Sequence, residues 1–234
     1  MNLRALLFSR DEHIIQLVNQ VLHDLGIEVA HSHDAQDAVQ RLTDERFNAI
    51  LVDDADASKA IRVLAAAKSL PSCQESVGIV LAASTTSLGL AEDARSSLVL
   101  YRPLSADRLR NGVKSVLNLR SGEDERKSHR VPVAIPATLH CVGIDRVLVF
   151  LANLSKGGAA FTVGRSVPPH SIQEIEFELP ETKEAIVASL EVVWRDAEGR
   201  MGVHFAKMEP NQAESLEKWL AAHPSAQQAN RANA

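Results

Sequence analysis

EIEFEL, residues 174–179, alternates acidic and apolar side chains one by one. Successive side chains of a β-strand point to opposite faces, so this pattern predicts a strand with one buried and one wet face. The same two-residue step recurs in residues 186–194 and 201–205. Strands of this kind are typical of antiparallel sheets. The second half of the chain is therefore expected to form an antiparallel β domain.

Two features frame these strands. Pro132 and Pro136 lie in the first apolar stretch and indicate an edge strand or a bulge, because proline cannot donate a ladder hydrogen bond. A closing helix is predicted to begin near Pro210 and to carry one apolar face. Residues 224–234 offer almost nothing to bury, so we expect a disordered tail.

The first 119 residues follow a different pattern, in which short apolar runs alternate with segments of helical period. This alternation predicts a parallel sheet with helices on both faces. Five strand–helix units in about 119 residues fit a flavodoxin-like, doubly wound α/β domain. Strands are predicted at 4–8, 27–30, 47–52, 77–83 and 98–101, and helices near 11–25, 34–42, 58–68, 87–94 and 105–119.

The bulk composition agrees with two folded domains. The chain has 234 residues, of which 45% are hydrophobic and 24% charged. Its net charge of -5 argues against nucleic-acid binding over the whole surface but leaves room for one small anionic ligand. Cys73 and Cys141 are too few for a disulfide framework. No run approaches the ~20 apolar residues of a membrane span, and no signal peptide is visible, so we expect a cytoplasmic protein without membrane insertion.

A basic motif, RKSHR, lies between the two domains. Arg126 and Arg130 are spaced four apart, with Lys127 and His129 between them. A guanidinium fork matches the O6 and N7 acceptors of guanine, and its charge attracts phosphate. The alternative is that these arginines belong to a solvated, charged linker over residues 120–130.

A second polar motif, NLSKGG, follows an apolar strand. Asn153 offers an amide and Ser155 a hydroxyl for hydrogen bonds. Gly157 and Gly158 are expected to permit positive φ and the close approach of a ligand. Together with the arginine pair, this turn predicts a site for a guanine nucleotide.

RxxxR followed by [D/N]xSxxG resembles the PilZ domain, a small bacterial β-barrel that senses cyclic di-GMP. The resemblance extends from about residue 125 to 222 and includes the GVHF strand and the closing helix. It implies domains at 1–119 and 126–223, with the arginines on the linker 120–130. The implied ligand contacts are Arg126, Arg130, Asn153, Ser155 and Gly158, with minor contributions from Lys127 and His129.

The first domain resembles the receiver domain of response regulators, in which an aspartate after the third strand accepts a phosphoryl group. That position is Asp53 here. The acidic pair that holds Mg²⁺ in receivers is replaced by Ser9 and Arg10, and the lysine after the fifth strand by Arg102. Mg²⁺ prefers carboxylate oxygens, so we expect a degenerate receiver without a metal, in which Arg10 pairs with Asp53 or with the next residue. The opposing hypothesis is a metal site built by Asp11, Asp53 and Asp54.

These observations predict a bacterial effector that is not an enzyme and needs no cofactor. Cyclic di-GMP is expected to order the linker 120–130 and to reorient the domains, passing the signal to an unidentified protein partner. The receiver-like domain could form a homodimer. Two other functions stay open: a response regulator controlled by phosphorylation of Asp53, and an adaptor that binds no small ligand.

Overall fold

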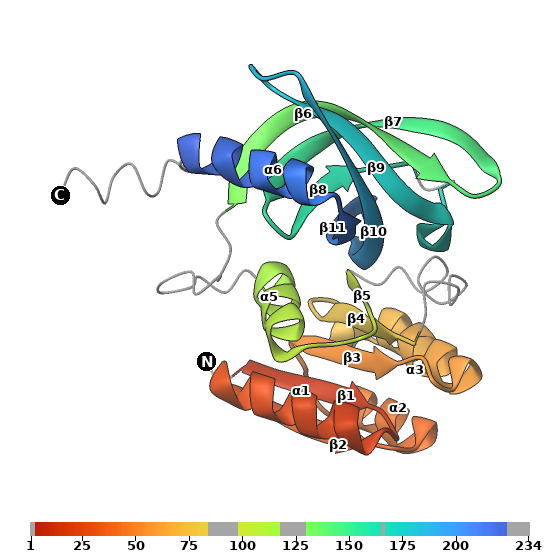
Figure 1. Cartoon of the computed structure of the whole chain (residues 1–234). Helices are drawn as coiled ribbons and strands as arrows, with labels where there is room; N and C mark the ends of the chain where they lie inside the picture. Colours follow the sequence, from red (N-terminus) through yellow and green to blue (C-terminus); the bar gives the residue numbers. More distant parts are fainter. Residues whose placement is uncertain (1–2, 84–97, 118–129, 165–166, 224–234) are drawn as a thin grey trace. The chain divides into compact units, whose positions relative to one another are not determined.

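The structure is a computed structural model, and it describes residues 3–83, 98–117, 130–164 and 167–223. The chain divides into two compact units, Met1–Gly122 and Glu123–Ala234. Each unit is described by itself, and Figure 1 gives the labels of its helices and strands.

The first unit is a parallel sheet in the order β2-β1-β3-β4-β5. This is the flavodoxin-like, doubly wound order, and the predicted fold class of the first domain is confirmed. The predicted helix at 87–94 lies outside the described residues. The strands are β1 (Leu3–Phe8), β2 (Ile27–Ser32), β3 (Ala49–Asp53), β4 (Val77–Ala82) and β5 (Leu98–Tyr101), and the helices are α1 (Glu12–Asp24), α2 (Ala35–Asp44), α3 (Ala57–Ser69), the short η1 (Pro71–Cys73) and α5 (Ala106–Val116).

Local sequence signals fix the helix ends. The Asp11 side chain accepts hydrogen bonds from two backbone N–H groups at the start of α1, and Asp34 does the same for α2. Gly26 has φ of 70°, the left-handed conformation that favours glycine where a helix ends. All of β3 is buried, as expected for the centre of a sheet covered on both faces.

The second unit is a closed antiparallel barrel in the order β8-β7-β6-β9-β10-β11, with β11 pairing back onto β8. Figure 1 shows β6 and β7 as a long curved pair within it. Apolar residues such as Ile175 and Phe177 fill the interior, and the intervening acids face outward, as the alternation predicted. The strands are β6 (Arg130–Cys141), β7 (Ile144–Ser155), β8 (Gly158–Thr162), β9 (Ile172–Leu179), β10 (Glu184–Asp196) and β11 (Arg200–Met208), with the short η2 (Pro169–Ser171) and α6 (Pro210–Ala222).

The two prolines of β6 do not mark an edge strand, because β6 pairs with both β7 and β9. The alternative of a bulge is correct: the register with β7 shifts between Pro132 and Ile135. Pairing with β9 begins only at Ala137, so both prolines precede the part of β6 that is hydrogen-bonded on its second side.

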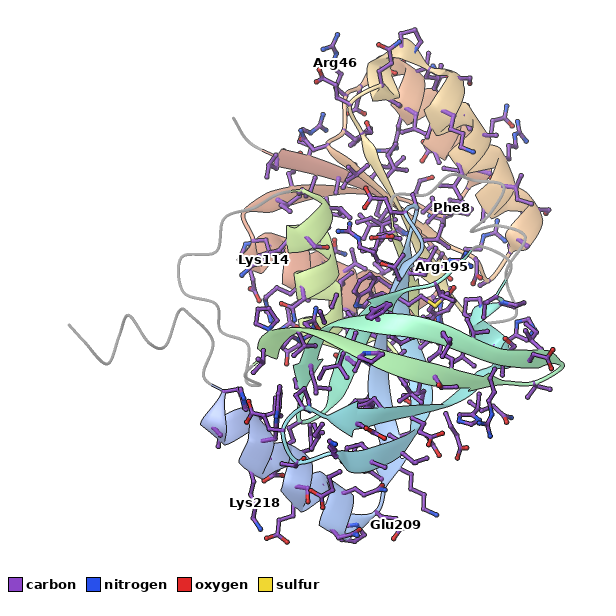
Figure 2. The ribbon with its side chains drawn as sticks, turned by 90° about the horizontal axis from the view of Figure 1, so that it is seen from above. Phe8, Arg46, Lys114, Arg195, Glu209 and Lys218 are labelled. Carbon is purple, nitrogen blue, oxygen red and sulfur yellow. The ribbon has the colours of Figure 1, made fainter. Side chains whose placement is uncertain are left out.

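α6 closes the domain by packing its apolar face on the barrel. Leu216, Trp219 and Leu220 are buried, and the Trp219 indole N–H donates to the Pro180 carbonyl at 3.1 Å. Such a donor needs a partner when a tryptophan is buried. In Figure 2, Glu209 lies at the start of the helix, and Lys218 extends from its exposed side.

Candidate functional site

Strand register brings Arg130, the last residue of the first polar motif, next to the second motif at one end of the β6–β7 pair. Arg130, the first residue of β6, lies opposite Ser155, the last residue of β7. Pro132 lies opposite Asn153 in the same ladder. Directly opposed residues of an antiparallel pair have Cα atoms only about 4.5–5.5 Å apart. Arg130 is exposed and Asn153 half-buried, so a ligand at this end of the pair can reach both.

The Asn153 amide has an unused acceptor. Its Oδ1 atom is buried and has no hydrogen-bond partner among the residues that the structure describes. A buried polar atom without a partner costs about 1–3 kcal/mol. Most buried polar atoms are satisfied, so an exception beside an exposed arginine is consistent with a binding site. The N–H groups on the edge of guanine are donors that suit this oxygen.

Ser155 is buried, and its hydroxyl donates to the Gly158 carbonyl at 2.9 Å. The bond spans the two-residue turn between β7 and β8, formed by Lys156 and Gly157. In this structure Ser155 therefore closes the turn, and its oxygen keeps one accepting position.

The expectation that the turn glycines supply positive φ is wrong, because neither Gly157 nor Gly158 adopts it. Gly158 is needed for a different reason: a Cβ atom there would overlap the Val203 carbonyl oxygen of β11. Gly157 has space, since the nearest atom to an added Cβ is His204 Nδ1 at 3.8 Å. Close strand packing, and not turn conformation, requires the glycine at 158.

Contacts from β11 and α6 hold the turn in place. The Gly157 carbonyl accepts from the Phe205 backbone N–H at 3.0 Å, and His204 Nδ1 lies 2.7 Å from the same oxygen. The Lys156 ammonium pairs with Glu217 of α6. His204 was not among the predicted site residues, although its place in the GVHF strand, opposite Gly158, could have indicated it.

The rest of the basic motif lies outside the described residues. Arg126, Lys127 and His129 are among them, so the contacts expected of these side chains stay predictions. The same holds for nearly all of the linker at 120–130 and for the tail at 224–234.

In the first unit, an arginine occupies the centre of the acidic cluster. Asp53 is buried at the end of β3, and its Oδ2 accepts from the Ser9 hydroxyl at 2.7 Å. The Arg102 guanidinium bridges two carboxylates, with Nη2 at 2.7 Å from Asp53 Oδ1 and Nη1 at 2.9 Å from Asp11 Oδ2. The hydrogen bond from Arg102 holds the pKa of Asp11 below its usual range. Burial works to lower the pKa of Arg102, but its bonds to the two carboxylates outweigh that and raise it.

This arrangement does not fit the Mg²⁺ of a receiver, because a fixed cation already lies between the two carboxylates. Asp54 turns elsewhere and accepts from the Ala83 backbone N–H at 2.6 Å. Within the described ranges, no three His, Cys, Asp or Glu side chains are grouped so as to hold a metal ion. The expected pairing of Arg10 with Asp53 or Asp54 is wrong, because the Arg10 Nε donates to the His33 carbonyl at 2.8 Å. The arginine that pairs with Asp53 is Arg102.

Comparison with known proteins gives a match for the second unit: residues 124–222 match the model of the PilZ domain. Similar solved structures include a receiver domain of a histidine kinase from Clostridium thermocellum (18% identity, covering 51% of this chain and 100% of that chain, TM-score 0.46). Another is the PilZ domain of CeSA from a cellulose-synthesizing bacterium (23% identity, 41% and 97%, TM-score 0.33). A third is the Bacillus subtilis inhibitor of motility MotI/DgrA (16% identity, 42% and 50%, TM-score 0.35). No curated protein matches the chain.

None of the described helices combines the length and the apolar character that crossing a membrane requires. The barrel topology and the matched family model agree over the second unit, and the strand order defines the first. Residues 124–222 of this chain are therefore a PilZ domain, and the unit that precedes them is a receiver-like α/β domain.

Proposed function

We propose that the PilZ domain of this protein is a receptor for cyclic di-GMP. The observation that carries the proposal is the β6–β7 register, which sets Arg130 opposite Ser155 beside the turn of the second motif. Arg130 of the first motif and Ser155 of the second, which are separated in sequence, thus lie at one end of one strand pair. The match to the PilZ family supports the same ligand class.

The chemistry of the described residues suits such a ligand. The Arg130 guanidinium can form paired hydrogen bonds with guanine or contact a phosphate. Asn153 offers an acceptor that the residues described in the structure leave unused. The turn is already fixed by β11 and α6, so little conformational entropy would be lost there on binding.

We further propose how the signal leaves the site. The arginine motif lies near the start of the second unit, shortly after the boundary at Gly122, and ends at Arg130, the first residue of β6. A ligand held by Arg126 and Arg130 would fix that segment against the barrel and change how the receiver-like domain is presented to a protein partner. Hydrogen exchange of residues 118–129 should then slow when the nucleotide is added. Unchanged exchange in a saturated complex would contradict this step and leave the binding proposal intact.

Calorimetric titration tests the site. Arg130→Ala, Arg126→Ala and Asn153→Ala should each weaken cyclic di-GMP binding by about 1–3 kcal/mol, the range for a paired guanine contact or for a lost hydrogen bond to a buried group. Arg146→Ala is the matched control, since it removes an exposed arginine of β7 about 30 Å along the strand from Ser155.

The outcomes separate clearly. If the three site variants bind cyclic di-GMP as tightly as the wild type, the nucleotide binds elsewhere on the chain. Equal loss in Arg146→Ala would indicate general charge attraction instead of a site. Cyclic di-AMP should bind much more weakly, because adenine lacks the O6 acceptor. A folded wild type that binds no cyclic di-GMP would refute the proposed function and favour an adaptor.

A further inference from the structure

The outer surface of the barrel carries two exposed apolar side chains beside a row of acids. Leu148 is 81% exposed and Phe150 67% exposed. They are two residues apart in β7 and so extend from the same side of the strand. Three outward acids of β9 complete what we call the β7–β9 face: Leu148, Phe150, Glu174, Glu176 and Glu178.

Strand register makes this face continuous. Leu148 of β7 lies opposite Thr138 of β6, and Thr138 lies opposite Glu176 of β9. Neighbouring strands are about 4.8 Å apart, so Leu148 and Glu176 are about 10 Å from each other across the surface. Figure 1 shows β6, β7 and β9 as adjacent strands of the barrel wall. An apolar stripe on β7 and an acidic stripe on β9 therefore run side by side, with β6 between them.

The acidic stripe keeps most of its charge. His140 of β6 lies 3.2 Å from Glu176, and Arg146 adds a positive charge at one end of β7. Over the described part of the chain, neither Glu174 nor Glu178 has an ion-pair partner. Like charges aligned along one strand repel one another, and a cationic partner relieves that repulsion.

The two stripes restrict what can bind. Complete burial of a leucine or a phenylalanine contributes about 1.5–3 kcal/mol, so covering both is a sizeable gain. A single exposed apolar residue is ordinary, but two large ones on one face form a patch. The adjacent acids repel an anionic lipid surface or a nucleic acid and attract lysine and arginine.

We infer that the β7–β9 face docks a basic, amphipathic segment of another protein. Its apolar side chains would cover Leu148 and Phe150, and its lysines or arginines would lie over the β9 acids. This inference does not rest on cyclic di-GMP binding, because none of these residues belongs to the nucleotide site.

A peptide of defined pattern tests the inference on the full-length protein. The probe is a labelled helical peptide of about 18 residues with leucines on one face and lysines on the other. A control peptide has the same sequence with glutamate in place of each lysine. Fluorescence anisotropy should show at least tenfold tighter binding of the lysine peptide. Leu148→Ser with Phe150→Ser should weaken that binding at least tenfold, and glutamine at all three β9 acids should weaken it and flatten its salt dependence. Ile61→Ser is the matched control, since Ile61 is 46% exposed but lies in the first unit.

Several results would overturn the inference. Equal binding of both peptides, or equal loss in Ile61→Ser, would show that the face does not select a basic segment. If sedimentation shows a dimer that Leu148→Ser with Phe150→Ser dissociates, the occupant is a second copy of this chain and the inference is wrong. Binding to phosphatidylglycerol vesicles through the same residues would identify a membrane surface. Because both side chains are exposed, unchanged thermal unfolding of the variants would show that folding is not the cause of any loss.

Discussion

Replacing Arg102 with methionine should destabilise the receiver-like domain while leaving the PilZ domain unaffected. The substitution keeps the apolar stem and removes the guanidinium that bridges Asp11 and Asp53. Asp53 is 2% exposed, and its remaining hydrogen bonds come from the Ser9 hydroxyl and the Ala55 backbone N–H. Removing one partner of a buried ion pair costs about 3–5 kcal/mol. Since the Arg102 side chain is 25% exposed and two hydrogen bonds survive, we expect about 2–3 kcal/mol.

The measurement must separate the two domains. Both tryptophans, Trp194 and Trp219, are in the PilZ domain, so their fluorescence in urea reports that domain alone and should not change. Native-state hydrogen exchange, followed peptide by peptide over β1 and β3, gives the opening free energy of the receiver-like domain. Arg200→Met is the control for a surface pair, since the Arg200 side chain is 59% exposed beside Asp196, and it should cost at most about 1 kcal/mol.

A double variant tests the cause. If the cost of Arg102→Met comes from a buried charge left without its partner, adding Asp53→Asn should restore at least about 1 kcal/mol. A double variant as unstable as Arg102→Met alone would refute this reasoning. So would an Arg102→Met cost no larger than that of Arg200→Met.

Three other predictions follow from local geometry. Gly158→Ala should destabilise the PilZ domain by about 1–3 kcal/mol in urea unfolding, because its Cβ would overlap a β11 carbonyl, whereas Gly157→Ala should be near neutral; equal effects would contradict the packing explanation. The pKa of Asp11 is held below its ordinary value of 3.8, so its contribution to stability is present above pH 3.8 and is lost as the pH falls through the lower folded value; Arg102→Met should flatten this acid dependence of exchange in the receiver-like domain. His223 stacks on Trp219, and its Nδ1–H donates to the Trp219 backbone carbonyl, which raises the pKa of the imidazole above 6.5; tryptophan fluorescence should therefore titrate with a midpoint above 6.5 and lose that step in His223→Gln, and a midpoint at or below 6.5 would count against the contact.

Much of the fold could be predicted because the periods of the two halves differ. The two-residue step of residues 174–179 and the helical period of α1 each identify which side chains face the interior. Capping residues such as Asp11 and Asp34 act on their immediate neighbours, so their roles are visible in sequence. Asp53 could also be located from the sequence, because the buried strand β3 ends where its run of apolar residues ends.

The errors concern contacts between distant segments. Arg10 and Arg102 both carry the charge that the acidic cluster needs, and only the fold shows that Arg102 reaches it. Gly158 was correctly expected to matter, but its constraint comes from β11, more than forty residues later in the chain. Pro132 suggested an edge because proline lacks an N–H, while the register shows that β9 simply begins its pairing further along β6. Side-chain type limits the chemistry, and tertiary pairing decides which residue performs it.

Closure of the barrel has a consequence for how this protein can be recognised. Each of the strands β6 to β11 has a partner strand on both sides, but not along its whole length: residues 144–150 of β7 pair with β6, and pairing with β8 begins only at Leu151. Strand addition to the PilZ domain is thereby confined to such partial edges, and elsewhere a partner must contact side chains on the outer wall of the barrel. The closure leaves little free edge for edge-to-edge aggregation, and the one-sided part of β7 is the part that carries the exposed Leu148 and Phe150. Among the described residues of the receiver-like unit, β2 pairs with β1 alone and β5 with β4 alone, so backbone-mediated association of that sheet would have to begin at one of these two edge strands.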